Sequence, residues 1–130
     1  MRTPTEVFRE QLTGITEGRF ADVLDLYAED VVVEQPFMLP EPLRIAGKDA
    51  LRAHFAGAPA DINLVATNVV VRQTDDPEVV VGEWDYTVNG RGSLANVIIM
   101  RVRDGLIVAS RDYHNHAAIG SWARAAADAG

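Results

Sequence analysis

Apolar residues in the first part of the chain recur every three to four positions, which is the spacing of one helix face. The first set consists of Val7, Phe8, Leu12 and Ile15. Thr3 and Pro4 precede this set and suit an N-cap and a first helical turn. Gly18 interrupts the pattern, and a second set follows, formed by Phe20, Val23, Leu24 and Tyr27. The spacing predicts two amphipathic helices, the second of which extends to Tyr27.

The middle of the chain changes character twice. The segment Val31–Val33 is short and β-branched, which predicts a strand and not a helix. An irregular loop is predicted next, because the stretch is interrupted by residues that lack a backbone donor, namely Pro36, Pro40 and Pro42. Gly47 then opens a third short helix, whose inner face is predicted to contain Leu51, Phe55 and, at its edge, His54.

The second half is rich in valine and isoleucine and predicts strands. Four segments are expected: Ile62–Thr74, Glu78–Val88, Ser93–Arg103 and Leu106–Asn115. Short turn-forming sequences separate them, and Asp104-Gly105 favours a tight hairpin turn. Successive hairpins imply an antiparallel meander, followed by a weak helix from Ala118. Helices followed by a long meander indicate an α+β fold, in which a strongly twisted sheet curls around the helices.

Length, charge and composition restrict the class of protein. The chain has 130 residues and is expected to form one domain, residues 1–130. Its net charge of −7 argues against binding to nucleic acid or to an anionic membrane surface. The absence of cysteine excludes disulfides and thiolate chemistry. No apolar run is long enough for a membrane span, and the first ten residues lack the apolar core of a secretory signal, so a cytoplasmic protein is expected.

A pair of titratable residues stands out on the last predicted strand. Asp112 and His114 are two positions apart, so their side chains share one face of the sheet. If that face lines a pocket, burial raises the pKa of Asp112 into the range useful for proton transfer. The alternative is a polar patch in water at the end of the strand.

Two further positions have equally open interpretations. His54 could line a pocket or be an ordinary boundary residue of its helix. Glu83 alternates with Trp84 along a strand, so it could face the interior or belong to a solvated face. No metal site is predicted, because a His114–His116 pair at a strand end is a weak ligand pattern.

Several segments resemble the nuclear transport factor 2-like superfamily. They are Leu26–Pro36, Gly47–Leu51, Asp104–Ile107 and Arg111–Tyr113. The chain is most similar to SnoaL-like members, including the phenazine-biosynthesis A/B proteins. The resemblance implies a conical α+β barrel, a deep apolar pocket and frequent homodimers. Because the superfamily contains isomerases, cyclases, dehydratases and non-catalytic proteins, the fold alone does not specify a reaction.

The resemblance also implies roles for individual residues. In phenazine-type proteins, a histidine on the third helix and a carboxylate on the last strand form an acid/base pair, and His54 and Asp112 match them. An aspartate stands here in place of a glutamate. Ketosteroid isomerases carry an aspartate as general base where this chain has Gln35, and an amide cannot exchange a proton near neutral pH. Standard steroid isomerase chemistry is therefore not expected.

These considerations lead to one main functional hypothesis. The chain is expected to bind a small apolar carbonyl compound and to catalyse cofactor-independent cyclisation, condensation, isomerisation or dehydration. Asp112 and His54 are the predicted catalytic residues. The predicted binding residues are His114, Glu83, Gln35, Asn96, Phe37 and Trp84. A homodimer through the outer sheet face is also expected, since the long strands carry apolar residues on both faces. The alternative is a non-catalytic ligand-binding or dimer-scaffold protein of the same fold.

Overall fold

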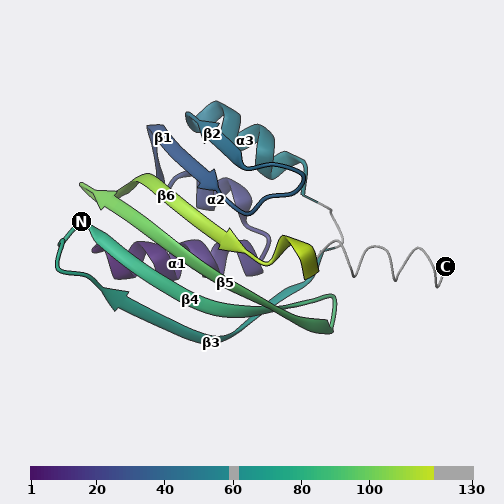
Figure 1. Ribbon diagram of the computed structural model, residues 1–130. Helices are drawn as coiled ribbons and strands as arrows, with labels where there is room; N and C mark the ends of the chain where they lie inside the picture. The colour runs from purple at the N-terminus through teal and green to yellow at the C-terminus, as the bar shows by residue number, and fades with distance from the viewer. Residues whose placement is uncertain (59–61, 119–130) are drawn as a thin grey trace.

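The computed structural model describes residues 1–58 and 62–118 and consists of three helices and six strands in these ranges (Figure 1). The helices are α1 (Pro4–Thr16), α2 (Phe20–Leu24) and α3 (Lys48–Ala56). The strands are β1 (Tyr27–Gln35), β2 (Leu43–Ala46), β3 (Leu64–Gln73), β4 (Val79–Val88), β5 (Arg91–Arg103) and β6 (Leu106–His114). None of the described helices is long and apolar enough to cross a membrane. The predicted α+β class is confirmed.

Helix α1 begins where the sequence predicts. The Thr3 hydroxyl accepts a hydrogen bond from the backbone N–H of Glu6 at 3.3 Å, and Pro4 occupies the first turn. The predicted apolar face is directed at the sheet, with Val7 and Phe8 fully buried.

The second helix is shorter than predicted. It ends at Leu24, and Tyr27 begins strand β1 instead of continuing the helix. The backbone N–H of Ile107 donates to the carbonyl of Leu26 at 2.8 Å, and Tyr27 pairs with Ile107 on β6. This pairing between distant segments overrides the helical spacing of the apolar residues. Strand β2, which lies in the stretch predicted as a loop, was also missed.

The six strands form one sheet in the order β2-β1-β6-β5-β4-β3. The predicted meander of β3 to β6 is confirmed and is antiparallel throughout, whereas β1 runs parallel to β6. Asn89-Gly90 and Asp104-Gly105 form the tight turns, with all four residues at positive φ. Residues 116–118 form a helical turn after β6, and the rest of the helix predicted from Ala118 falls outside the described residues.

The helices cover one face of this twisted sheet. Figure 1 shows α1 crossing behind the long strands, while α3 and β2 lie at the edge opposite to β3. Phe8 on α1 packs against Gly82 and Trp84 of β4. The inner face of the sheet is therefore sealed by α1 at its centre, and the polar side chains described next lie on this face.

Candidate functional site

The inner face of β6 carries three polar side chains in a row: Ser110, Asp112 and His114. In the antiparallel pairing with β5 they lie opposite Met100, Ile98 and Asn96, respectively. On the other side, Glu34 of β1 pairs with Arg111, which places the buried Gln35 beside Asp112. The alternation predicted for Asp112 and His114 is thus present, and it points into the protein.

Asp112 is a buried carboxyl group, with an exposed fraction of 8%. The Ser110 hydroxyl donates a hydrogen bond to its Oδ1 at 3.0 Å. Burial raises the pKa of Asp112 to about 7, and the hydrogen bond from Ser110 opposes this rise. A carboxyl group with such a pKa can take up and release a proton near neutral pH.

Two buried tyrosines lie within the electrostatic range of Asp112. Burial is the main cause that raises the pKa of Tyr27 and Tyr86, and the negative charge of Asp112 raises both further. The Gln11 amide donates to the Tyr27 hydroxyl at 3.3 Å. Both phenols therefore stay protonated and can donate hydrogen bonds toward an oxygen that gains negative charge.

His114 is held by Asn96. Its Nδ1 lies 2.7 Å from the Asn96 Oδ1, across the β5–β6 pair. Burial lowers the pKa of His114 to about 4, with a smaller contribution from His116. The imidazole is consequently neutral at physiological pH and cannot supply a positive charge to Asp112.

A groove of about 440 Å³ lies at the end of β6, and Tyr113, which alternates with Asp112 and His114, faces it from the outer side of the strand. Phe37 and Tyr113 form one wall, with ring centroids 5.2 Å apart in an edge-to-face arrangement. Asn96, His114 and His116 also line the groove. Of the predicted binding residues, Phe37, Asn96 and His114 therefore line the same groove, whereas Asp112 is not among its lining residues.

Two predicted site residues lie elsewhere. Glu83 is exposed and forms an ion pair with Arg72 on the outer face of the sheet, which corrects the expectation that it joins the pocket. Its neighbour Trp84 faces the interior instead. His54 is exposed on α3, partial desolvation lowers its pKa, and no hydrogen bond joins it to Asp112 within the described residues. The pairing of His54 with Asp112 stays a prediction.

Sequence reasoning missed four members of the buried polar cluster: Gln11, Tyr27, Tyr86 and Ser110. Ser110 could have been found, because it is two positions before Asp112 on the same strand. Tyr86 could have been found from its alternation with Trp84. Tyr27 was missed because its spacing from Val23 and Leu24 fits a helix face, so it was assigned to the second helix. In the described part of the chain, no cluster of three or more His, Asp or Glu side chains could hold a metal ion.

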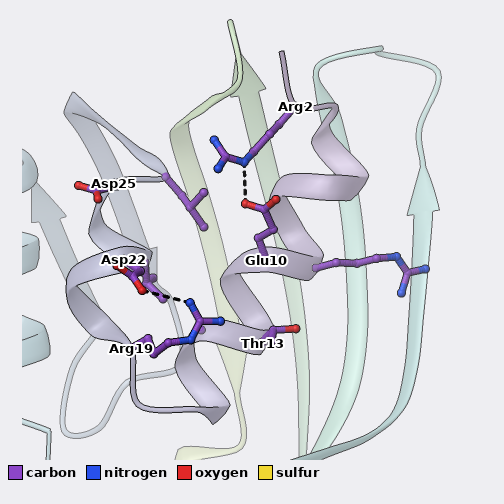
Figure 2. A pocket seen from close by; sticks show the side chains of 10 residues that line it. Arg2, Glu10, Thr13, Arg19, Asp22 and Asp25 are labelled. Carbon is purple, nitrogen blue, oxygen red and sulfur yellow. Dashed lines mark hydrogen bonds and ion pairs between the residues drawn. The ribbon is translucent and has the colours of Figure 1, made fainter.

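A second hollow of about 480 Å³ lies at α1 and α2 and has a different chemical character (Figure 2). Figure 2 shows two ion pairs in it, Arg2–Glu10 at 2.6 Å and Arg19–Asp22 at 3.1 Å. These side chains are about half exposed, and solvated ion pairs of this kind bind weakly. The hollow offers no buried acid or base comparable to Asp112.

Comparison with known proteins supports the family expected from the sequence. The SnoaL-like domain family matches residues 8–110. The chain belongs to this family. It is also 30% identical over 117 residues to an uncharacterized PhzA/B-like protein of Pseudomonas aeruginosa, covering 85% of this chain and 82% of the relative.

Solved structures confirm the nuclear transport factor 2-like fold. A crystal structure described as a candidate isomerase from Bacillus subtilis has 29% identity and a TM-score of 0.74, with 85% of each chain covered. A candidate polyketide cyclase from Xanthomonas campestris has a TM-score of 0.75 at 20% identity, covering 92% of this chain and 93% of its own. The SnoaL-like chain thus has the conical α+β fold that its sequence resemblance implied.

Proposed function

We propose that this SnoaL-like protein binds a small, mostly apolar carbonyl compound and catalyses a cofactor-independent proton transfer with Asp112. The observation that carries the proposal is the buried Asp112 carboxyl group, whose pKa is raised to about 7. Half of such groups are ionised at neutral pH, so the same residue can act first as base and then as acid. The names of related isomerases and cyclases are consistent with this class of reaction.

The surrounding residues suggest how the reaction proceeds. The Asp112 carboxylate removes a proton from the carbon next to the substrate carbonyl, and the electrons of that C–H bond form an enolate. The protonated hydroxyls of Tyr27 and Tyr86 donate hydrogen bonds to the enolate oxygen. Asp112 then returns the proton to another carbon, or to a leaving hydroxyl in a dehydration. In this proposal His54 acts as a second proton-transfer residue.

A non-catalytic ligand-binding protein is the second candidate function. One observation favours it: the residues lining the groove at the end of β6 include Asn96 and His114 but not Asp112. In that case, the polar cluster around Asp112 would serve only to satisfy its own hydrogen bonds.

Exchange of carbon-bound hydrogen distinguishes the two functions. We expect the protein to accelerate deuterium incorporation next to the carbonyl of 2-tetralone in heavy water, measured by NMR above the rate in buffer alone. The rate should rise with pH as Asp112 ionises and level off above about 7. Ser110→Ala should shift the midpoint upward, because the Ser110 hydrogen bond lowers the pKa of Asp112.

The matched control is Ser93→Ala, which removes an exposed hydroxyl from β5. It should leave both the rate and the midpoint unchanged. A midpoint that stays the same in Ser110→Ala would show that a group other than Asp112 controls the exchange.

We also propose that the protein forms a homodimer through the outer face of the sheet. This face contains an apolar patch formed by Val81, its pairing partner Ile99, and Val97, and the ion pair of Glu83 with Arg72 borders it. Ile99 has an exposed fraction of 39%, which is high for a large apolar side chain in a central strand. Light scattering at micromolar concentration should give twice the 14.2 kDa mass of the chain.

Ile99→Arg should convert the dimer to a monomer, because it places a charge in the apolar patch of both subunits. Leu106→Arg is the control, since it changes an equally exposed residue at the end of β6. A wild-type mass of one chain would refute the dimer.

A further inference from the structure

The buried Gln11 side chain reaches the Tyr27 hydroxyl from the helix layer. Its amide nitrogen donates to the Tyr27 Oη at 3.3 Å, across the space between α1 and β1. Gln11 follows the fully buried Phe8 by three positions, so it lies on the face of α1 that covers the sheet. The amide thus links α1 to one of the two tyrosines that serve the proposed reaction.

Both ends of this hydrogen bond are held in place. Phe8 anchors this part of α1 against Trp84, with ring centroids 5.6 Å apart. Tyr27 pairs with Ile107 on β6, and its ring packs edge-on against Phe55, with 6.3 Å between the ring centroids. The Tyr27 hydroxyl therefore has a fixed position relative to α1.

The direction of the hydrogen bond matters for the phenol. Because the Tyr27 oxygen accepts from Gln11, its own hydrogen is not used in this contact and can be donated to another oxygen. Burial and the charge of Asp112 raise the pKa of Tyr27, and the bond from Gln11 opposes this rise. A phenol whose oxygen accepts a hydrogen bond is a stronger donor, because the hydrogen bonds in a chain polarise one another.

We propose that Gln11 is a positioning residue, which holds the Tyr27 hydroxyl so that its hydrogen is free for the enolate oxygen of the substrate. This inference rests on the proposed function, in which Tyr27 donates to that oxygen. The Gln11 Oε1 is sealed from solvent and has no hydrogen-bond partner among the described residues. An unpartnered buried oxygen destabilises a fold, so packing alone favours an apolar side chain at this position.

Tyr86, the second buried tyrosine, is held differently. Its ring packs edge-to-face against Trp84, with 5.6 Å between the ring centroids. Burial raises the pKa of Tyr86, and the nearby Trp84 opposes this rise. The Trp84 Nε1 nevertheless forms no hydrogen bond of normal geometry with the residues that the structure describes. A change at Gln11 should therefore act through Tyr27 and not through Tyr86.

A double-mutant cycle tests the route through Tyr27. The kcat and KM for deuterium exchange into 2-tetralone are measured at pH 8, where Asp112 is ionised. Gln11→Met should lower kcat about three- to tenfold, the factor that one neutral hydrogen bond contributes, and should leave KM nearly unchanged. In a Tyr27→Phe background the same change should have no further effect, whereas in Tyr86→Phe it should keep its full effect.

Gln73→Met is the matched control. The Gln73 amide donates to the backbone carbonyls of Asp76 and Val79 at the β3–β4 hairpin, so this change should leave kcat unaltered. Urea unfolding should show that Gln11→Met is at least as stable as the wild type, because it also removes the unpartnered oxygen. A loss of stability would assign Gln11 a structural role instead. An unchanged kcat, or an equal loss with and without Tyr27, would also overturn the proposal.

The direction of the hydrogen bond is tested without substrate. Nuclear Overhauser contacts should join a Gln11 side-chain amide proton to the Tyr27 ring protons beside the hydroxyl, and Tyr27→Phe should shift the signal of that amide proton. Amide protons turned away from Tyr27 would mean that the Gln11 oxygen accepts the phenolic hydrogen, which overturns this inference alone. A wild-type protein that does not accelerate exchange would overturn the proposed function, and this inference with it.

Discussion

Replacing Asp112 by asparagine is expected to stabilise the protein at pH 8 while it abolishes proton transfer. The amide has nearly the shape of the carboxyl group and can still accept the Ser110 hydrogen bond, but it carries no charge to bury. It also cannot act as a base, so the exchange rate should fall about a hundredfold or more. Activity and stability would thus change in opposite directions at one residue.

The pH dependence of this effect follows from the pKa of Asp112. It is about 7 in the folded protein, against 3.8 for an unperturbed aspartate, so the folded state binds the proton more tightly than the unfolded state. The stability of the wild-type protein therefore falls as pH rises from about 4. The full cost of burying the ionised Asp112 carboxylate is reached above pH 7. At pH 8 this cost is at most roughly 4 kcal/mol, to be compared with the net stability of a small domain.

Urea unfolding at pH 5 and pH 8 measures this difference. Asp112→Asn should be much more stable than the wild type at pH 8, and its advantage at pH 5 should be less than half as large. Asp85→Asn, which removes a half-buried carboxylate bonded to Asn68, is the matched control. An equal gain at both pH values would mean that Asp112 is not a raised-pKa group.

Gly82→Ala should destabilise the protein by about 1–3 kcal/mol, the usual cost of adding a methyl group to a packed core. A Cβ at this position would lie 2.3 Å from two ring carbons of Phe8. The Phe8 ring is fully buried, and its centroid lies 5.6 Å from the ring centroid of Trp84, so the ring has little room to move. The cost therefore arises where α1 seals the inner face of the sheet.

Thermal or urea unfolding provides the measurement, and Gly57→Ala provides the control. Gly57 has a helical φ, and an added Cβ would meet only the carbonyl oxygen of His54 at 3.4 Å. The double variant Phe8→Leu with Gly82→Ala should lose less stability than the two single changes added together, because leucine relieves the clash. Additive losses would show that Phe8 does not cause the effect.

The antiparallel part of the fold could be predicted from sequence because its signals are local. Asp104-Gly105 and Asn89-Gly90 identify tight turns without knowledge of distant residues, and valine-rich segments between them predict strands. Tyr27 was assigned incorrectly because its partner, Ile107, is remote in sequence. Strand β2 was missed since it is only four residues long and follows three prolines.

The candidate site was predictable only in part, for a related reason. A two-residue period shows that Glu83 and Trp84 face opposite sides, but it does not show which side is covered by helices. Asp112 was found from its alternation with His114 and from the family resemblance. The hydrogen bond between His114 and Asn96 depends on the β5–β6 register, which the sequence does not specify.

The parallel pairing of β1 with β6 has a consequence for how the protein folds. Among the described strands, β1 pairs with β2 and β6, so β2 is the one partner that is synthesised soon after it. During synthesis the β1–β2 hairpin must wait for the last strand before it can join the sheet, whereas β3, β4 and β5 pair in order as they emerge. Such non-local pairing slows folding and leaves strand edges open to other chains. A ribosome-bound chain that ends after β5 should therefore expose the edges of both β1 and β5, and these are the places where a chaperone would act.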